Sequence, residues 1–251
     1  MKNQYLNQLY DTPGYISNLS LETNELSFFR EAITLQWMLK IKEVSLDTFY
    51  KIKKNNISIE NYHLISESIN HESIWSKRSR VLDKVITYKF LKSSFFNKLE
   101  NLFGNIIISD EEDLGYGNIY WRLVRPNKSN DVGPYHRDSW FWDLNKSFPK
   151  PDYPFTRIKI WISIYNELGK NGLLAEKNSH KRRDILWKGK FKDGIIKPIL
   201  NDNQENFNME LIPTKAGDCI IFNDDLLHGG AINLGLKTRI SVEFTILKKE
   251  T

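Results

Sequence analysis

The chain is poor in cysteine, since Cys219 is the only one among its 251 residues. A single cysteine excludes an internal disulfide and any zinc or iron–sulfur site that needs several thiolates. A metal bound by this chain must therefore depend on histidine and carboxylate ligands. Cys219 itself stands in an apolar stretch, so we expect it to pack as a small hydrophobic side chain.

Long apolar runs are also missing. No stretch approaches the roughly 18 consecutive apolar residues of a membrane span, and no apolar run follows the N-terminal residues. We therefore expect a soluble, cytoplasmic protein without a membrane span. The sequence does not indicate an oligomeric state.

The sequence has no continuous basic arm, although its net charge is +5. The basic residues are spread along the chain, and no zinc-finger pattern accompanies them. We therefore expect no nucleic-acid partner. The positive charge suits an acidic small molecule equally well.

The first hundred residues are expected to be mostly helical. Apolar residues recur every three or four positions from Leu26 to Val44, which is typical of a helix with one buried face. A second stripe runs from Ile74 through Val85 and Tyr88 to Leu102, and Gly104 follows as a C-terminal signal.

After Gly104 the pattern changes to short runs rich in β-branched and aromatic residues, separated by turns. The expected strands are Asn105–Ser109, Asn118–Val124, Arg157–Tyr165, Glu210–Ile212, Cys219–Phe222 and Thr238–Leu247. Many short strands favour a jelly-roll over a parallel α/β sheet. We predict an α+β fold in one domain, 1–251, with a double-stranded β-helix (cupin-like jelly-roll) core over 105–248 and a helical part, 1–104, packed on its outside.

Two candidate metal ligands stand close together in His136-Arg137-Asp138. Residues two apart on a strand point to the same side, so His136 and Asp138 can reach one metal while Arg137 faces away. Two histidines and one carboxylate are a ligand set that leaves positions open on iron. The third ligand has to come from a distant strand.

His228 is the candidate for the third ligand. It follows a buried strand and a short loop and precedes Gly229 and Gly230, which predicts a strand start with little crowding. Arg239 comes eleven residues later. Its guanidinium fork is suited to holding a carboxylate through paired hydrogen bonds.

Four segments together resemble the phytanoyl-CoA dioxygenase-like branch of the Fe(II)/2-oxoglutarate-dependent oxygenases. They are Gly133–Asp138, the strand Lys159–Ile164, the run Asn171–Leu174 leading to Ser179-His180, and Gly217 through His228 to Arg239. The resemblance extends from about Tyr120 to Phe244. Any one segment alone is common, but all four occur in the expected order.

The resemblance implies roles for individual residues. His136, Asp138 and His228 would bind Fe(II), and Arg239 would bind the distal carboxylate of 2-oxoglutarate. Trp161 matches a tryptophan that lines the co-substrate site, and Ser241 shares the strand face of Arg239. Either Trp121 or Arg122, on the strand before the metal-binding loop, would contact the other end of the co-substrate. Related halogenating enzymes have a small residue in place of Asp138, so halogenation is not expected.

Other histidines and aromatic residues have two interpretations. His63 and His71 are expected on the surface, and His180 is expected to be structural. Trp140 and Trp142 either line the substrate mouth or pack in the core. The basic residues between Lys177 and Lys192 are typical of a solvated face, but the resemblance places this loop near the entrance, so Arg182 or Arg183 is a candidate for binding an anionic group of the substrate.

The resulting hypothesis is a dioxygenase that uses Fe(II), 2-oxoglutarate and O2 to hydroxylate a C–H bond, with succinate and CO2 as co-products. The expected substrate is a polar or anionic small molecule, with a sugar or surface-glycan precursor as one candidate. The metal ligands are the only catalytic groups expected. One alternative is a non-oxygenase metal-binding jelly-roll, an isomerase or a small-ligand binding module. Another is a module that binds an anionic polymer.

Overall fold

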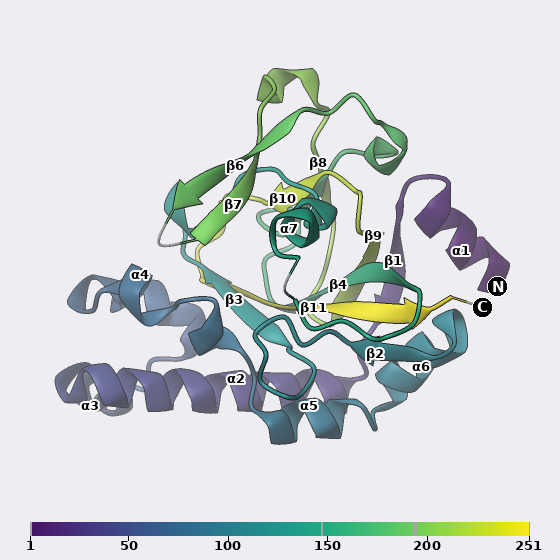
Figure 1. The fold of residues 1–251 in the computed structure, drawn as a ribbon. Coiled ribbons are helices and arrows are strands. Elements are labelled where there is room, and N and C mark those ends of the chain that lie inside the picture. Colours follow the sequence, from purple (N-terminus) through teal and green to yellow (C-terminus); the bar gives the residue numbers. More distant parts are fainter. Residues whose placement is uncertain (1, 147, 193–194, 251) are drawn as a thin grey trace.

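The computed structural model describes residues 2–146, 148–192 and 195–250 (Figure 1). The α-helices are α1 (Lys2–Tyr10), α2 (Thr23–Val44), α3 (Leu46–Lys54), α4 (His71–Ile74), α5 (Lys84–Phe90), α6 (Ser94–Phe103) and α7 (Asp138–Leu144). The strands are β1 (Tyr15–Ser20), β2 (Ile106–Ile108), β3 (Tyr120–Val124), β4 (Phe155–Tyr165), β5 (Leu173–Ala175), β6 (Trp187–Lys192), β7 (Ile195–Leu200), β8 (Glu210–Ile212), β9 (Asp218–Asn223), β10 (His228–Gly230) and β11 (Arg239–Lys249).

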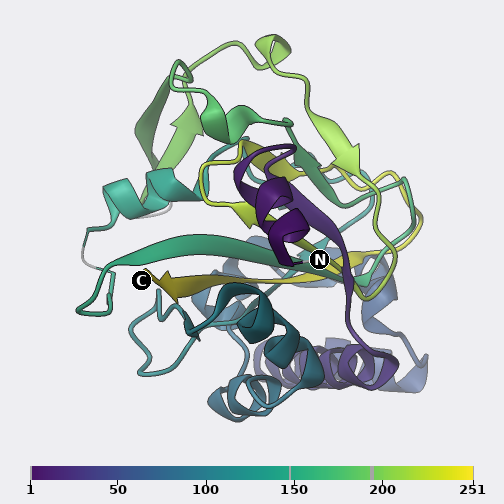
Figure 2. The same ribbon diagram turned by 90° about the vertical axis from the view of Figure 1, so that its right-hand side faces the viewer.

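The larger sheet is antiparallel and contains strands from both ends of the chain. Its order is β1-β9-β4-β11-β2, and β3 pairs with the first half of β11 on the same edge as β2. The smaller sheet has the order β10-β5-β8, and β6 and β7 form a separate hairpin. Figure 2 shows the larger sheet nearly edge-on, with helices below it and the smaller sheet above.

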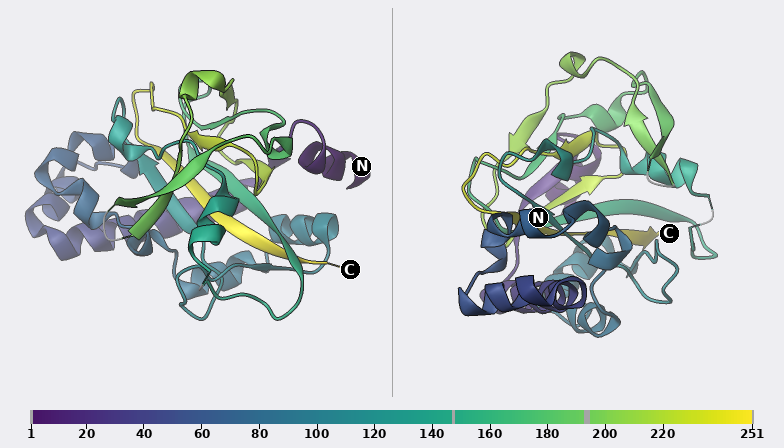
Figure 3. Two further views of the ribbon diagram at one scale, coloured as in Figure 1. Left: turned by 45° about the horizontal axis from the view of Figure 1, so that its top comes forward. Right: turned by 90° about the vertical axis from the view of Figure 1, so that its left-hand side faces the viewer.

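Side chains alternate between the two faces of the larger sheet. On β4 the isoleucines 158, 160, 162 and 164 all face the helices and are fully buried. They pack with Phe29, Ile33, Trp37 and Ile41 of α2, which recur every four residues along one helix face. The main hydrophobic core therefore lies between the sheet and the helices, which form separate layers in Figure 3.

The opposite face of the larger sheet looks toward the smaller sheet. A second, smaller cluster fills part of this space, including Trp161 from β4, Phe222 from β9 and Leu173 from β5. Two facing antiparallel sheets with helices on the outside confirm the predicted α+β jelly-roll architecture.

Most predicted elements are present, but three differ from the structure. The predicted second stripe is interrupted, because a turn separates α5 from α6, and Val85 and Tyr88 are exposed. The helical N-terminal part also contributes β1, an edge strand that pairs with β9. A strand was expected through Asp138, where α7 begins instead.

The expectation of a surface position is wrong for His71, whose side chain is only 13% exposed. Its Nδ1 lies 2.9 Å from the Tyr62 hydroxyl, and its Nε2 lies 3.5 Å from Asp131. Burial lowers the pKa of His71 to about 4, although Asp131 acts in the opposite direction. His63 is half-buried and contacts the Thr238 hydroxyl.

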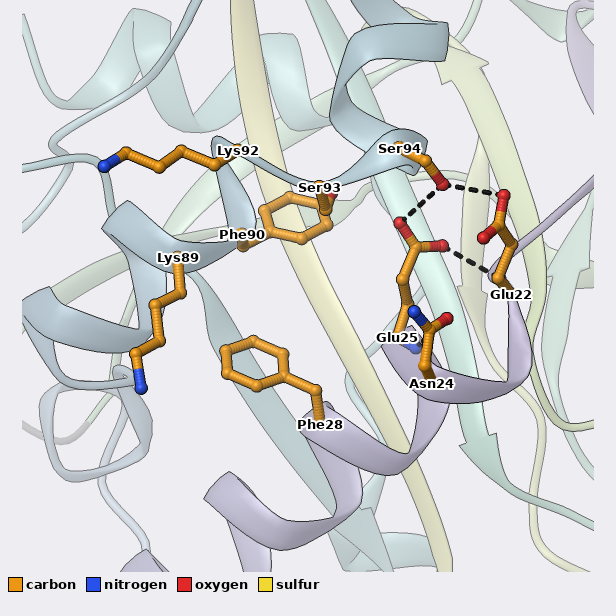
Figure 4. Close-up of a pocket in the computed structure, with 9 residues that line it drawn as sticks. All are labelled: Glu22, Asn24, Glu25, Phe28, Lys89, Phe90, Lys92, Ser93 and Ser94. Carbon is orange, nitrogen blue, oxygen red and sulfur yellow. Dashed lines mark hydrogen bonds between the residues drawn. The ribbon is translucent and has the colours of Figure 1, made fainter.

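A hollow of about 330 Å³ with both polar and apolar lining lies on the helical side of the molecule, between the start of α2 and the α5–α6 turn (Figure 4). The Glu25 side chain lines this hollow. Its carboxylate accepts hydrogen bonds from the Ser94 hydroxyl and the Phe95 N–H, both at the start of α6. It also accepts one from the Glu22 N–H, just before α2. Its carboxylate therefore caps two helix N-termini at once. These polar groups already serve each other as partners.

In the part of the chain that the structure describes, no helix is both long enough and apolar enough to cross a membrane.

Ile160 provides a test of the core between the sheet and the helices. Replacing this fully buried side chain by alanine (Ile160→Ala) should lower the free energy of unfolding by about 2–5 kcal/mol, because it leaves a cavity that the packed sheet cannot close. Chemical denaturation measures the change. The exposed Leu39, on α2, is the control, and its replacement by alanine should change stability by no more than about 0.5 kcal/mol. Equal losses in the two variants would contradict this account of the core.

Candidate metal centre

Three side chains that can hold a metal ion meet between the two sheets: His136, Asp138 and His228. Their candidate ligand atoms all lie within 4.8 Å of one another. His136 and His228 pair backbone to backbone, and each N–H donates to the other's carbonyl at 3.0 Å. The pairing adds the segment around His136 to the free edge of β10. It brings together two ligands that are far apart in the sequence.

The segment His136-Arg137-Asp138, called the HxD segment below, has an extended backbone only as far as Arg137. Arg137 has extended backbone angles, and Asp138 is the first residue of α7. His136 and Asp138 still reach the same centre, because the intervening residue is extended. Arg137 points away, as predicted, and donates to the carbonyls of Ser179 and Arg182.

Backbone carbonyls orient both imidazoles. Nδ1–H of His136 donates to the Pro134 carbonyl at 2.8 Å, and Nδ1–H of His228 donates to the Leu226 carbonyl at 3.0 Å. Each ring therefore presents the lone pair of Nε2 to the centre. Burial lowers the pKa of His136 to about 4 and also lowers the pKa of His228. Both rings are neutral at pH 7, which is the form that binds a metal.

The carboxylate of Asp138 completes the set. Oδ1 lies 3.8 Å from Nε2 of His136, and Oδ2 lies 3.5 Å from Nε2 of His228. Burial alone would raise the pKa of Asp138, but Lys159 and the two histidines outweigh it and hold the pKa below its usual value. Oδ2 is buried without a hydrogen-bond partner among the described residues.

These observations fit a bound divalent ion. Metal bonds to imidazole nitrogen or carboxylate oxygen are about 2.0–2.2 Å long, so one ion can bridge atoms at these separations. A buried carboxylate oxygen without a partner is costly, and a metal would supply the missing interaction.

Close backbone approach at Gly229 brings the HxD segment against β10. A Cβ at this position would lie 2.8 Å from the Tyr135 ring, which is closer than real side chains allow. The glycine predicted to reduce crowding beside His228 is therefore needed for contact with Tyr135.

Arg239 lies on the same inner surface as the three candidate ligands. It begins β11, is 2% exposed, and has its guanidinium 5.7 Å from the centre of the Trp161 ring. Among the described residues it forms no ion pair within 4 Å, and its Nε has no hydrogen-bond partner. Burial, followed by repulsion from Arg122, lowers its pKa to about 10, so it remains charged at pH 7.

Two serine hydroxyls without hydrogen-bond partners stand near Arg239 on neighbouring strands. Ser241 on β11 lies opposite Ser163 on β4, and both are fully buried. Neither Oγ has a hydrogen-bond partner in the described part of the chain. A buried arginine and two buried hydroxyls without partners form a site suited to an anion.

The structure shows that Trp121 and Arg122 lie on opposite faces of β3. Trp121 faces the helices and packs in the main core against Trp75. Arg122 faces the inner surface, and its Nε donates to Glu243 at 2.7 Å. Its side chain is 40% exposed, so part of it is open to solvent.

The substrate candidates from the sequence take packed positions. Trp140 stacks on Trp187 of the β6–β7 hairpin at 5.3 Å, and Trp142 packs against Phe148. Both tryptophans are buried, and their role in substrate binding stays a prediction.

Arg182, the remaining substrate candidate, pairs with Glu176 and Asp184, and its role also stays a prediction. His180 is buried and contacts the Tyr10 carbonyl, in keeping with the structural role expected of it.

Sequence reasoning overlooked Lys159, Ser163 and Glu243 at this centre. The signal for Lys159 and Ser163 was present, because isoleucine alternates with other residues throughout Arg157–Ile164. Once the isoleucines are assigned to the core, Lys159 and Ser163 must share the inward face with Trp161.

A comparison with protein families finds one match over most of the chain. The profile of the phytanoyl-CoA dioxygenase (PhyH) family matches residues 40–241. No curated protein sequence matches the chain.

Several solved structures share the fold at low sequence identity. AviO1 from Streptomyces viridochromogenes Tue57 is 11% identical with a TM-score of 0.55, covering 98% of this chain and 94% of its own. EctD from S. alaskensis, solved with 2-oxoglutarate and 5-hydroxyectoine, is 12% identical with a TM-score of 0.55, covering 97% and 74%. SnoK, an alpha ketoglutarate dependent carbocyclase from nogalamycin biosynthesis, is 11% identical with a TM-score of 0.56, covering 99% and 84%. These likenesses show a common fold.

Metal binding should depend on His228. His228→Ala should weaken Mn(II) binding by more than about 100-fold, because losing an outer partner of a ligand already costs about 10–100-fold. Anaerobic titration calorimetry measures the dissociation constant. His63→Ala, which removes a half-buried histidine on the helical side, should bind Mn(II) as the wild type does. Unchanged binding in His228→Ala would exclude this centre as the metal site.

Proposed function

Because the chain belongs to the phytanoyl-CoA dioxygenase family, we propose that it is an Fe(II)- and 2-oxoglutarate-dependent dioxygenase that hydroxylates a polar or anionic small molecule. The observation that carries the proposal is the buried guanidinium of Arg239, which has no ion-pair partner among the described residues. A metal centre alone would not require a second buried cation. A dicarboxylate co-substrate would require one, because one of its carboxylates can bind the metal and the other can bind the arginine.

The three protein ligands are proposed to be His136, Asp138 and His228. The carbonyls of Pro134 and Leu226 keep the imidazoles in the orientation that presents Nε2. Three protein ligands leave further positions of the metal open for co-substrates.

The distal carboxylate of 2-oxoglutarate is proposed to bind Arg239, Ser241 and Ser163. Each contributes a buried donor that lacks a partner in the described structure, so binding would satisfy all three. Trp161 lies beneath the guanidinium and would form the wall of this pocket. Arg122, which faces the same space, is proposed to contact the opposite end of the co-substrate.

When bound, iron with 2-oxoglutarate and O2 supplies the oxidation: the co-substrate becomes succinate and CO2, and one oxygen atom enters a C–H bond of the substrate. The protein residues bind and orient. The buried inner surface also limits water near the reacting atoms, with Phe141 and Phe222 packed against the two imidazoles. The reaction requires no further acid–base pair in the proposed mechanism.

Co-substrate binding gives the most direct test. Anaerobic addition of Fe(II) and 2-oxoglutarate to the wild type should produce the visible charge-transfer band of the chelate. Arg239→Met should weaken 2-oxoglutarate binding by about 100-fold or more, because two charge-assisted hydrogen bonds of about 1.5–3 kcal/mol each are lost. Ser163→Ala and Ser241→Ala should each weaken it by about tenfold or more.

The matched control is Arg183→Met, which removes an arginine whose side chain is 76% exposed and should leave the titration unchanged. A wild-type protein that stays colourless at saturating ligand would defeat the proposed function. A band whose titration is unaffected by Arg239→Met would leave the metal site standing and remove the proposed carboxylate pocket.

The substrate and the chemical outcome call for a turnover assay. With a suitable substrate, the protein should release succinate under oxygen, and hydroxylation should add one oxygen atom to the product mass. A panel of acidic sugars, amino acids and phosphonates covers the proposed class. A product that loses two hydrogens instead would indicate desaturation or ring closure.

The same assay separates the alternatives. A non-oxygenase jelly-roll would bind metal and form no succinate. A module for an anionic polymer would show salt-sensitive polymer binding that survives His136→Ala.

A further inference from the structure

Lys159 lies on the inward face of β4, two residues before Trp161. It is only 8% exposed, although lysine is among the residues least often buried. Burying an ammonium group costs several kcal/mol unless an anion lies close to it. A lysine in this position therefore needs a carboxylate partner.

Two carboxylates near Lys159 already have cations of their own. Glu243 accepts a hydrogen bond from Arg122 at 2.7 Å, and Glu111 accepts one from Lys77 at 3.0 Å. Among the described residues, the only carboxylate within 4 Å of the Lys159 ammonium is that of Asp138, whose Oδ1 lies 3.7 Å away. The buried lysine is thus paired with a candidate metal ligand.

The two oxygens of Asp138 have different surroundings. Oδ1 lies 3.7 Å from the Lys159 ammonium and 3.8 Å from Nε2 of His136, whereas Oδ2 lies 3.5 Å from Nε2 of His228 and has no hydrogen-bond partner among the described residues. A protein cation therefore stands beside Oδ1, and among the described residues none stands within 4 Å of Oδ2.

We propose that Lys159 is a positioning residue that makes Asp138 a one-oxygen ligand: the ammonium retains Oδ1, and only Oδ2 is presented to the metal. This inference rests on the proposed function for the identity of the metal centre. It adds a role for a residue outside the ligand set.

The arrangement matters for the number of open positions on the metal. A carboxylate that bound through both oxygens would take one of the positions that the co-substrates need. Without Lys159, Oδ1 would be a buried charge without a partner, and the nearest cation left would be the metal itself. The lysine thus preserves an open position by competing for Oδ1.

Crystal structures of the Mn(II)-loaded protein test the inference directly. In the wild type, Oδ2 should bond the metal at about 2.0–2.6 Å, while Oδ1 lies outside this range and within hydrogen-bond distance of the Lys159 ammonium. In Lys159→Met, both oxygens should move into the bonding range. Lys159→Arg, which keeps a cation beside Oδ1, should restore the one-oxygen geometry.

Arg157→Met is the matched control, because Arg157 lies on the same face of β4 but pairs with Asp224. It should leave the coordination of Asp138 as in the wild type. If Lys159→Met does not fold, Lys159→Gln replaces it, and the wild-type geometry is a test by itself.

Four outcomes would overturn the inference. Bonding through both oxygens in the wild type, or through Oδ1 alone, would exclude the proposed division of the carboxylate. One-oxygen bonding that persists in Lys159→Met would show that other contacts fix it. These three results leave the proposed function intact. Absence of Mn(II) from the three ligands, in contrast, would remove the inference and the proposed function together.

Discussion

The alternation of side chains along β4 separates the hydrophobic core from the candidate site. Four isoleucines face the helices, and Arg157, Lys159, Trp161 and Ser163 face the smaller sheet. Because β4 pairs with both β9 and β11 in the larger sheet, its register also fixes the inward faces of its neighbours. A slip by one residue would place the lysine among the helices and the isoleucines in the site.

The second element of the site is the direct backbone pairing of His136 with His228. Two hydrogen bonds hold the HxD segment to β10, and the absence of a side chain at Gly229 lets Tyr135 approach. These contacts determine the separation of the two imidazoles. The carbonyls of Pro134 and Leu226, each two residues before its histidine, then determine which nitrogen of each ring faces the centre.

Several polar atoms without hydrogen-bond partners gather at the candidate site. Around the centre, Asp138 Oδ2, Arg239 Nε and two serine hydroxyls are buried without partners in the described part of the chain. Buried polar atoms without partners are costly, so their concentration in one region indicates a ligand-binding site. The opposite charges at its two ends, the carboxylate and the guanidinium, suit a metal and an anion.

The sequence by itself determined the chain's candidate ligands and most of its strands. His136, Asp138, His228 and Arg239 could be chosen because their spacing and flanking glycines are local features, and α2 could be predicted from a regular stripe. The choice between Trp121 and Arg122 could not be made, because it depends on the face of β3 that meets the helices. The start of α7 at Asp138 and the burial of His71 were also missed, since both depend on contacts with distant segments. Only the tertiary structure could show that Lys159 meets Asp138 and that Ser163 lies opposite Ser241, because strand pairing, and not sequence spacing, sets these distances.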